Sequence, residues 1–129
     1  MNNDRFYSPS DLYPKKLNKK TTDDDKICHI KFWYCHNKYP LEKLCSKDLK
    51  ALISFFQKIE VMTWTAIKID TGLNYETPTH FNDPMPSLFP VDATAISMRV
   101  NKKFRIIGWR ESQYLNIMWF DKNHVSYPG

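Results

Sequence analysis

Two arginines and two side chains near the C-terminus offer the clearest chemistry in this sequence. Arg99 and Arg105 stand six positions apart, and His124 and Tyr127 come close to the end of the chain. Guanidinium groups bind phosphate through paired hydrogen bonds, and a histidine can accept or donate a proton near neutral pH. Together these residues predict acid–base chemistry at a phosphate group.

The same residues also have plainer interpretations. Each arginine could pair with a nearby carboxylate or lie in solvent, and a single histidine near a chain end is more often a surface residue. The sequence FDKNH, residues 120–124, could form an Asx-type turn that His124 merely flanks. The sequence leaves both interpretations open.

Hydrophobic alternation places the two arginines side by side. The expected strands are 95–100, 104–109 and 114–120. A three-residue turn, NKK, between the first two strands keeps their apolar residues on one face and puts Arg99 opposite Arg105. Facing cations destabilise a sheet by roughly 0.2–1 kcal/mol, and a bound phosphate would remove that cost. We expect the pair on the exposed face of the sheet.

The last two strands show a similar division into two faces. A four-residue turn at 110–113 would pair Trp109 with Tyr114 and leave a wholly apolar set facing the core. That core set is Phe104, Ile106, Gly108, Leu115, Ile117 and Trp119. The mixed face combines aromatic rings with cations, as single-stranded nucleic-acid binders do. The candidate nucleic-acid contacts are Lys102, Lys103, Trp109, Arg110, Tyr114 and Lys122.

The stretch CHIKFWYCH, residues 28–36, raises the question of a zinc site. In a strand, Cys28 and His36 would share one face about 26 Å apart, and His29 and Cys35 the other face about 20 Å apart. Zinc–ligand bonds are only about 2.0–2.3 Å long, so one ion cannot join either pair. We expect no metal and no cofactor, and interpret the stretch as a half-buried strand.

The remaining pattern predicts an α+β fold with an antiparallel sheet and two short helices. A strand is expected at 27–36, and Ser46 is a plausible N-cap for a helix through about Ile59. The expected core-facing stripe of that helix is Leu49, Leu52, Ile53, Phe56 and Ile59. Thr63 could cap a second helix, WTAIKI. Residues 71–93 hold four prolines and fit no regular element.

Composition sets the broad class of the protein. The chain has 129 residues, which suits a polar, flexible arm at 1–26 and one domain at 27–129. Its formal net charge is +5, and residues 99–129 hold six Lys and Arg against two acidic residues, so an acidic partner is favoured. With three glycines, no phosphate-binding glycine loop is possible. The absence of a long apolar run or signal peptide predicts a cytoplasmic protein with no membrane association.

The ending RIIGWRESQYLNIMWFDKNHVSYP, on a strand–helix–helix–meander domain, resembles the RelE/ParE superfamily of bacterial toxins over residues 47–127. By position, Arg99 and Arg105 resemble the basic residues that the family carries on neighbouring strands. His124 and Tyr127 resemble its C-terminal catalytic groups. The chain departs from the family pattern in its N-terminal extension and in the insertion at 71–93.

The resemblance implies a ribonuclease that cuts mRNA on the ribosome without a metal and is inhibited by a cognate antitoxin. Some members of the superfamily attack gyrase instead. The alternative is a binding module of phage or mobile-element origin, whose basic and aromatic face grips nucleic acid or a host protein without catalysis. A structural or assembly protein is a third possibility, which no particular residue supports.

Overall fold

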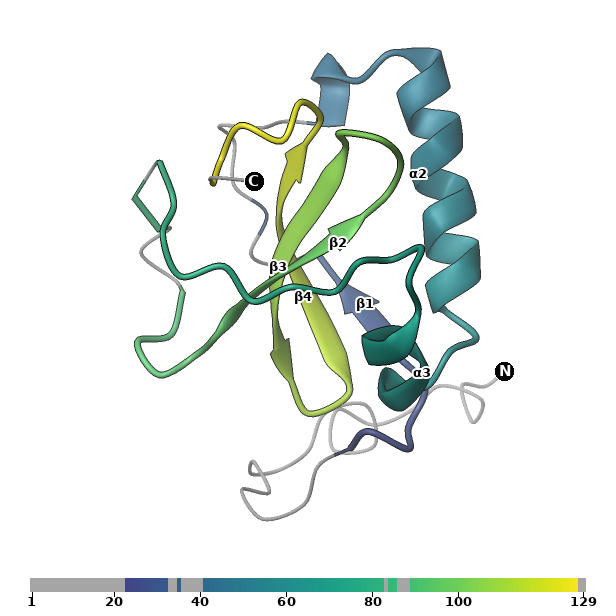
Figure 1. Ribbon diagram of the computed structural model, residues 1–129, viewed down its shortest axis with the longest axis vertical. Helices are drawn as coiled ribbons and strands as arrows, with labels where there is room; N and C mark the ends of the chain where they lie inside the picture. The colour runs from purple at the N-terminus through teal and green to yellow at the C-terminus, as the bar shows by residue number, and fades with distance from the viewer. Residues whose placement is uncertain (1–22, 33–34, 36–40, 83, 86–88, 128–129) are drawn as a thin grey trace, which may run out of the picture.

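A computed structural model describes residues 23–32, 35, 41–82, 84–85 and 89–127. In chain order its elements are β1 (His29–Lys31), the 3-10 helix η2 (Leu41–Lys43), α2 (Ser46–Ile59), α3 (Trp64–Ile69), β2 (Ala95–Arg99), β3 (Arg105–Glu111) and β4 (Tyr114–Asp121). This order confirms the predicted α+β fold (Figure 1). The predicted 27–36 strand is shorter in the structure: only β1 is regular, Ile27 forms an isolated bridge with Thr63, and Cys28, Phe32 and Cys35 belong to no strand. Residues 33–34 and 36 lie outside the described chain. The predicted arm lies outside it too, except for residues 23–26.

The strands that the structure describes form a single sheet in the order β1-β4-β3-β2. Strands β2, β3 and β4 make the antiparallel meander that the sequence predicts. Strand β1 pairs with β4 in parallel, with His29 opposite Tyr114, so the sheet is mixed rather than wholly antiparallel. Parallel neighbours need a long crossover connection, and the chain between β1 and β4 includes both helices.

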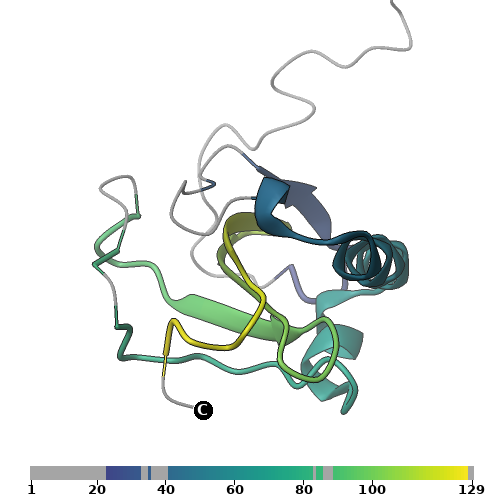
Figure 2. The ribbon, with the colours of Figure 1, turned by 90° about the horizontal axis from the view of Figure 1, so that it is seen from above.

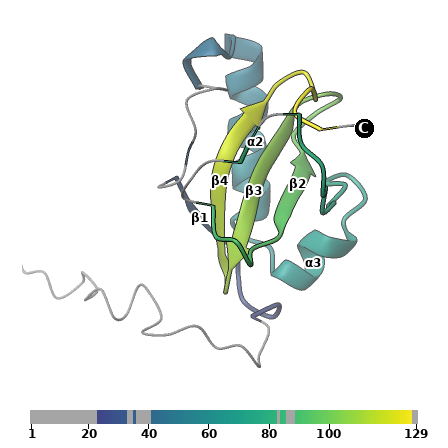
Figure 3. The same cartoon turned by 90° about the vertical axis from the view of Figure 1, so that its left-hand side faces the viewer.

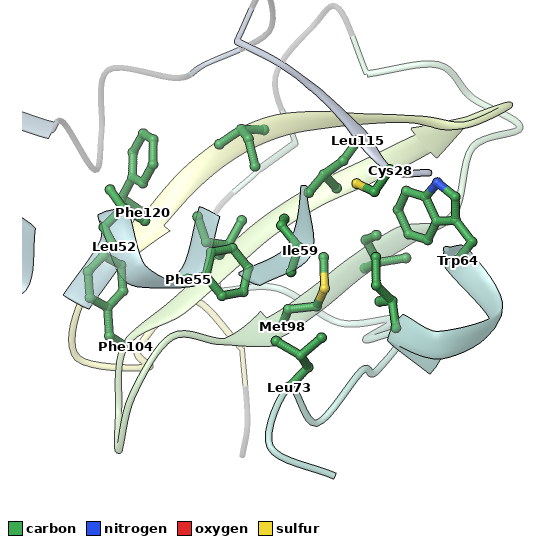
Figure 4. Packing of buried hydrophobic residues seen from close by; sticks show 14 of the residues in the cluster. Cys28, Leu52, Phe55, Ile59, Trp64, Leu73, Met98, Phe104, Leu115 and Phe120 are labelled. Atoms are coloured by element: carbon green, nitrogen blue, oxygen red, sulfur yellow. The ribbon is translucent and has the colours of Figure 1, made fainter. Parts of the chain in front are cut away.

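Helices α2 and α3 cover one face of the sheet (Figures 2 and 3). Leu52, Phe55 and Ile59 of α2 are buried in the same cluster as Ile106 and Ile117 of the strands. Figure 4 shows the three α2 side chains pointing into this cluster. Full burial of a side chain of this size stabilises a protein by roughly 1.5–3 kcal/mol. The helix-covered face therefore supplies much of the stability of the fold.

Both helices begin within one residue of the predicted positions. The N-cap of α2 is Cys45 rather than Ser46, and the backbone N–H of Cys45 donates to the Asp48 carboxylate at 3.2 Å. Thr63 caps α3 as predicted, since its Oγ1 accepts a hydrogen bond from the Ala66 N–H at 3.2 Å. Local capping chemistry is thus readable from the sequence.

The buried stripe of α2 is rotated from the predicted one. Leu49 and Ile53 are 39% and 55% exposed, whereas Phe55 is buried and Phe56 is only partly buried. The buried positions are Asp48, Leu52, Phe55 and Ile59. These positions also repeat at three- and four-residue intervals, so the apolar pattern alone could not choose between the two stripes.

The turn between β3 and β4 is shorter than predicted. Ser112 and Gln113 form it, and Glu111 pairs directly with Tyr114. Ser112 has a φ of 60°, in the left-handed region, which tight hairpin turns commonly require. The predicted four-residue turn at 110–113 is therefore wrong, and Trp109 pairs with Asn116 instead of Tyr114.

A β-bulge in β4 removes Trp119 from the predicted core. The pairing with β3 steps from Ile117 to Trp119, so Met118 is an extra residue on β4. One extra residue reverses the alternation of side chains beyond it. Phe120 therefore packs in the helix-covered cluster, whereas Met118 and Trp119 pack on the second face of the sheet.

The described residues of 75–93, which are 75–82, 84–85 and 89–93, form a covering segment over the second face, and part of it crosses in front of the sheet in Figure 1. Glu76 and Ser97 exchange backbone hydrogen bonds of 3.0 and 2.8 Å at the edge of β2. Farther along, Phe81 and Phe89 pack against a second buried cluster. That cluster is Ile107, Trp109, Met118, Trp119 and Tyr127. The sheet face that was predicted to be exposed is therefore largely buried under this covering segment.

Candidate nucleic-acid interface

One end of the sheet gathers cations from three segments. These are the end of β2, the connection from β2 to β3, and the chain just after β4. Helix α2 starts near the same end (Figure 1), and Nζ of Lys122 lies 3.0 Å from Oδ2 of Asp48 at the start of that helix. We call this region the basic end, and it comprises Arg99, Lys102, Lys103, Arg105, Lys122 and His124.

Arg99 and Arg105 are direct partners across β2 and β3, in the register that hydrophobic alternation predicts. Arg105 is only 5% exposed, however, because its face is covered. Its Nη1 donates to the carbonyls of Asn101, Lys102 and Phe104 at 3.1, 3.0 and 3.2 Å. Arg105 therefore fastens the connection that carries the two lysines instead of projecting into solvent.

Arg99 is half-buried and differs from Arg105 in having unused hydrogen-bonding capacity. Within the described residues, its guanidinium takes part in no hydrogen bond or ion pair, and its Nε is buried without a partner. Lys102 and Lys103 are exposed and likewise have no carboxylate partner in the described chain. Unpaired guanidinium and ammonium groups at the same end of a sheet favour an anionic ligand.

Asp121 fixes the turn that carries His124. Its fully buried carboxylate accepts hydrogen bonds from the Val125 N–H at 3.0 Å and from the N–H and Oγ of Ser126 at 2.9 and 2.5 Å. His124 has a φ of 55°, a left-handed conformation that is uncommon for a residue with a side chain. The sequence offered a turn closed by a side chain as the alternative to a catalytic role for His124. Such a turn is present, and it holds this histidine in place.

Tyr127 packs against His124, with their ring centroids 4.6 Å apart. The Tyr127 hydroxyl lies 2.7 Å from Oγ of Ser97 and donates to Oε1 of Glu76 at 3.1 Å. Burial raises the pKa of Tyr127, so the hydroxyl stays protonated at neutral pH. Nε2 of His124 is buried and has no hydrogen-bond partner in the described part of the chain. That nitrogen therefore has an unused hydrogen-bonding position but no surface exposed to solvent.

The structure divides the predicted nucleic-acid contacts between different places. Lys102, Lys103 and Lys122 lie at the basic end. Trp109 is buried beneath the covering segment, where its ring lies 6.3 Å from that of Phe89. The remaining two predicted contacts, Arg110 and Tyr114, lie at the opposite end of β3 and β4. The predicted continuous basic and aromatic surface is therefore wrong.

We call that opposite end the hairpin end, made of residues 110–114 together with the acidic turn 23–26. Nη1 of Arg110 lies 2.6 Å from Oδ1 of Asp24, and the guanidinium lies 4.4 Å from the ring centroid of Trp64. Nζ of Lys68 approaches the other oxygen of Asp24 at 3.1 Å. Cations at the hairpin end are thus neutralised within the fold.

The acidic turn, which the sequence places in a flexible arm, is part of this contact. Asp23 accepts a hydrogen bond from the Ser112 hydroxyl and pairs with Lys26 at 3.3 Å. The hydrogen bond from Ser112 holds the pKa of Asp23 below its ordinary value of 3.8. Burial by itself would raise the pKa of Asp24, but hydrogen bonds from Arg110 and Lys68 outweigh it and lower that pKa. Both carboxylates are therefore charged at neutral pH.

The cysteine and histidine stretch behaves in part as a strand should. Cys28 is buried and His29 is exposed, and burial raises the pKa of the Cys28 thiol to about 12. Cys35, which was expected to be half-buried, is exposed, and His36 lies outside the described residues. Within the described chain, no group of three or more His, Cys, Asp or Glu side chains could hold a metal ion.

In the part of the chain that the structure describes, no helix has the length and apolar character needed to cross a membrane. A scan against protein-family models and searches of curated proteins and of solved structures found no match to this chain. The chemistry of the basic end must therefore be argued from its own geometry.

The sequence did not point to the residues that support His124 and Tyr127. Asp121 and Ser126 close the turn around His124, and only the Asx-type pattern at 120–124 hinted at this. Ser97 and Glu76 reach Tyr127 across 30 and 51 positions of sequence. No local pattern signals contacts over such separations.

Proposed function

We propose that this protein is a RelE-like toxin, a ribonuclease that cuts mRNA on the ribosome in the cytoplasm. The observation that supports it best is the gathering of Arg99, Arg105, His124 and Tyr127 at one end of the sheet. These are the residues that correspond by position to the catalytic groups of the family. The strand–helix–helix–meander order supports the same proposal.

The proposed reaction is attack of a ribose 2′-oxygen on the adjacent phosphorus. The new P–O2′ bond forms as the P–O5′ bond breaks, which yields a 2′,3′-cyclic phosphate and a 5′-hydroxyl. The 2′-hydroxyl proton must leave, and the 5′-oxygen must gain a proton. Nε2 of His124 carries one of these transfers and solvent water the other, and Arg99 stabilises the charge that develops on the phosphate. These steps need neither a metal nor an organic cofactor.

Arg105 and Tyr127 have supporting roles in this proposal. Both are 5% exposed, and their polar groups already bind backbone carbonyls, Ser97 or Glu76. Tyr127 positions the His124 ring by packing against it. Arg105 holds the connection that presents Lys102 and Lys103 to the RNA backbone.

An inhibitory protein partner, the antitoxin, belongs to the same proposal. Leu49 and Ile53 expose apolar surface on α2, and Phe32 is 51% exposed beside Phe56, with ring centroids 5.8 Å apart. Exposed apolar residues that gather on one surface favour a protein contact. A small, acidic, partly helical protein would complement this surface and the net positive charge of the chain.

A non-enzymatic nucleic-acid-binding module is the second candidate. The burial of Tyr127 and Arg105 favours it, because neither side chain reaches solvent to touch a substrate. Such a module needs the cations of the basic end but no proton transfer. The two candidates therefore differ in their dependence on His124.

The decisive experiment expresses wild type and His124→Ala in bacteria, with growth and mRNA 5′ ends followed together. Acid–base catalysis typically contributes about 10²–10⁴-fold to a rate, so His124→Ala should relieve toxicity and remove new 5′ ends. His29→Ala is the matched control, since His29 is an exposed histidine on β1 at the hairpin end. Toxicity without new 5′ ends, or a harmless wild type, would reject the nuclease.

A further inference from the structure

Three exposed lysines surround the start of α2. Lys43 ends η2, and Lys47 and Lys50 lie in the first two turns of α2. Within the described chain, none of the three side chains forms an ion pair or a hydrogen bond. We call these residues the lysine surface. Unpaired surface cations contribute little to the stability of a fold, so these three are available to a ligand.

The lysine surface adjoins the basic end. Nζ of Lys122 lies 3.0 Å from Oδ2 of Asp48, which is the residue next to Lys47. In Figure 1, η2, the start of α2, the β2–β3 connection and the chain after β4 lie together at the top. Figure 2 looks down on them, and Figure 3 shows the same grouping from the side. The two groups of cations therefore share one end of the molecule.

Positive charge is concentrated at this end. Residues 41–50 and 99–105 together with Lys122 hold eight Lys and Arg against Glu42 and Asp48, a balance of +6. The whole chain carries +5, so the remaining residues are slightly acidic in sum. Asp48 is already engaged, because it also accepts hydrogen bonds from the backbone N–H and the thiol of Cys45 at 3.2 and 3.1 Å. A surface of this kind attracts a polyanion.

Among the described residues, no exposed aromatic ring accompanies these lysines. Phe32 is 51% exposed, but it packs against Phe56. Phe56 follows Lys47 by nine residues, about two and a half turns, and therefore lies on the opposite side of α2. The aromatic residues that α2 and the neighbouring strands bring to this end are buried, namely Phe55, Phe104, Phe120 and Tyr127.

The lack of rings favours one form of nucleic acid over another. Proteins that bind single strands without sequence preference combine cations with aromatic rings on which the bases stack. Double-helical RNA keeps its bases stacked inside, so proteins recognise it mainly by its shape and through its phosphates and 2′-hydroxyls. Lys47 and Lys50 are neighbours on the helix surface, because they stand three positions apart. Lysines grouped in this way suit the phosphates of a double helix.

We propose that the lysine surface, together with Lys102 and Lys103, docks on the phosphate backbone of a double-helical RNA segment. The proposal rests on the proposed function for the choice of RNA as the polymer. It deepens that function, because the double helix is a second RNA partner, distinct from the single strand that is cut beside Arg99 and His124.

Binding of the full chain to fluorescently labelled RNA tests the proposal without relying on cleavage. One probe is an RNA duplex of about 16 base pairs, the span of a common double-stranded RNA-binding domain, and the other is one of its strands alone. We expect the duplex to bind more tightly than the strand. The triple variant Lys43→Gln, Lys47→Gln, Lys50→Gln should lower duplex affinity by about tenfold or more, whereas affinity for the strand should change less than about twofold.

The salt dependence of duplex binding gives a second readout. Each phosphate contact to a duplex contributes about 0.9 to the slope of log affinity against log salt, so the triple variant should lower the slope by about 2.7. Lys58→Gln is the matched control on the same helix, because Nζ of Lys58 lies 3.2 Å from Oδ1 of Asp70. Its slope should equal that of wild type. Glutamine and lysine have similar helix propensities, so both variants should fold.

The proposal is overturned if the duplex binds no more tightly than the strand, or if the triple variant keeps the duplex affinity of wild type. It is also overturned if poly-glutamate, a model of an acidic protein, binds through these lysines and duplex RNA does not. Duplex binding that depends on the lysines in a chain that cuts no RNA would keep the docking surface and reject the nuclease. Cleavage of mRNA by a chain whose duplex binding ignores the three substitutions would keep the nuclease and reject the surface.

Discussion

At the hairpin end, Arg110 and Lys68 both reach the carboxylate of Asp24, and Lys26 reaches Asp23. At the basic end, Lys122 pairs with Asp48, but Arg99, Lys102 and Lys103 have no carboxylate partner in the described chain. Both regions involve β3 and β4, and they lie at opposite ends of these strands. They differ in whether the fold itself neutralises the cations.

This difference separates cations that stabilise the fold from cations that are available for a ligand. A paired, partly buried arginine contributes to stability, and its loss strands a carboxylate. An unpaired surface cation contributes little to stability and attracts polyanions at long range. Net charge alone does not show which cations belong to which class.

The largest effect is expected at the bulge, which lies between the two ends. A Cβ on Gly108 would stand 2.3 Å from the carbonyl oxygen of Asn116 on the neighbouring strand, and a backbone atom in a sheet cannot move aside. Gly108→Ala should therefore cost about 3 kcal/mol, the upper end for an overpacked site. Urea unfolding measures this loss.

Gly72→Ala is the matched control for that substitution. Its Cβ would meet only the ends of the Asp70 and Lys58 side chains, at 3.2 and 3.3 Å, and flexible side chains can move. Its unfolding midpoint should stay close to that of wild type. Equal stability of the two alanine variants would show that the bulge does not hold the strands in this register.

Next in size is the loss of the arginine at the hairpin end. Arg110→Gln removes the ion pair with Asp24 and the contact with the Trp64 ring. Breaking a fully buried pair costs about 3–5 kcal/mol, and the partial exposure of this pair reduces the expected loss to about 2 kcal/mol. Chemical denaturation gives the value directly.

The corresponding substitution at the basic end should have little effect on stability but a clear effect on RNA binding. Arg99→Gln should change stability by less than about 0.5 kcal/mol, because the guanidinium makes no hydrogen bond or ion pair in the described chain, but should weaken RNA binding. Arg110→Gln should leave RNA affinity unchanged when compared under folded conditions. If both variants lose stability and affinity together, the two ends do not differ as we describe.

A smaller effect is expected on the pH dependence of stability. The pKa values of Asp23 and Asp24 are held below 3.8 in the folded state. Their contribution is therefore present above about pH 4 and is lost as pH falls through 3.8 towards the folded-state values. Asp24→Asn should lower stability by about 1 kcal/mol at pH 7 and by nothing near pH 2.

Asp25→Asn provides the comparison within the same turn, because Asp25 is exposed and has no ion-pair partner in the described chain. Its stability should follow that of wild type at every pH. Unfolding curves recorded between pH 2 and pH 7 test both variants. A constant difference between Asp24→Asn and wild type across that range would contradict the assignment.

The smallest effect concerns the salt dependence of RNA binding. For single strands, each phosphate contact contributes roughly 0.7 to the slope of log affinity against log salt. Lys102→Gln and Lys103→Gln should each reduce the slope by about that amount, whereas Lys26→Gln should not change it. Equal slopes for all three variants would show that the basic end does not contact the RNA backbone.

The sequence predicted those parts of the fold that depend on local patterns. Helix caps at Cys45 and Thr63 agree with their predicted positions to within one residue. The pairing of Arg99 with Arg105 follows from strict alternation across a short connection. The prediction from alternation failed at Trp119, because a single bulged residue reverses the alternation and no residue type marks the bulge.

The burial of the site could not be predicted for a different reason. The covering segment contains no periodic pattern, although the aromatic rings of Phe81 and Phe89 were a sign that it packs on something. The pairing of Asp24 with Arg110 spans 86 positions of sequence. Contacts over such distances depend on the assembled sheet, which is why the sequence placed the acidic turn in a flexible arm.

The parallel pairing of β1 with β4 also constrains how the chain can fold as it is made. His29 cannot form its strand pair until Tyr114, its partner 85 residues later in the chain, has been synthesised. At a synthesis rate of about 5–20 residues per second, this delay is roughly 4–17 seconds. The place of β4 between β1 and β3 stays empty during this interval. High contact order of this kind also slows folding after release. Until β4 has been made, the edge of β1 that it pairs with has no neighbouring strand in the sheet.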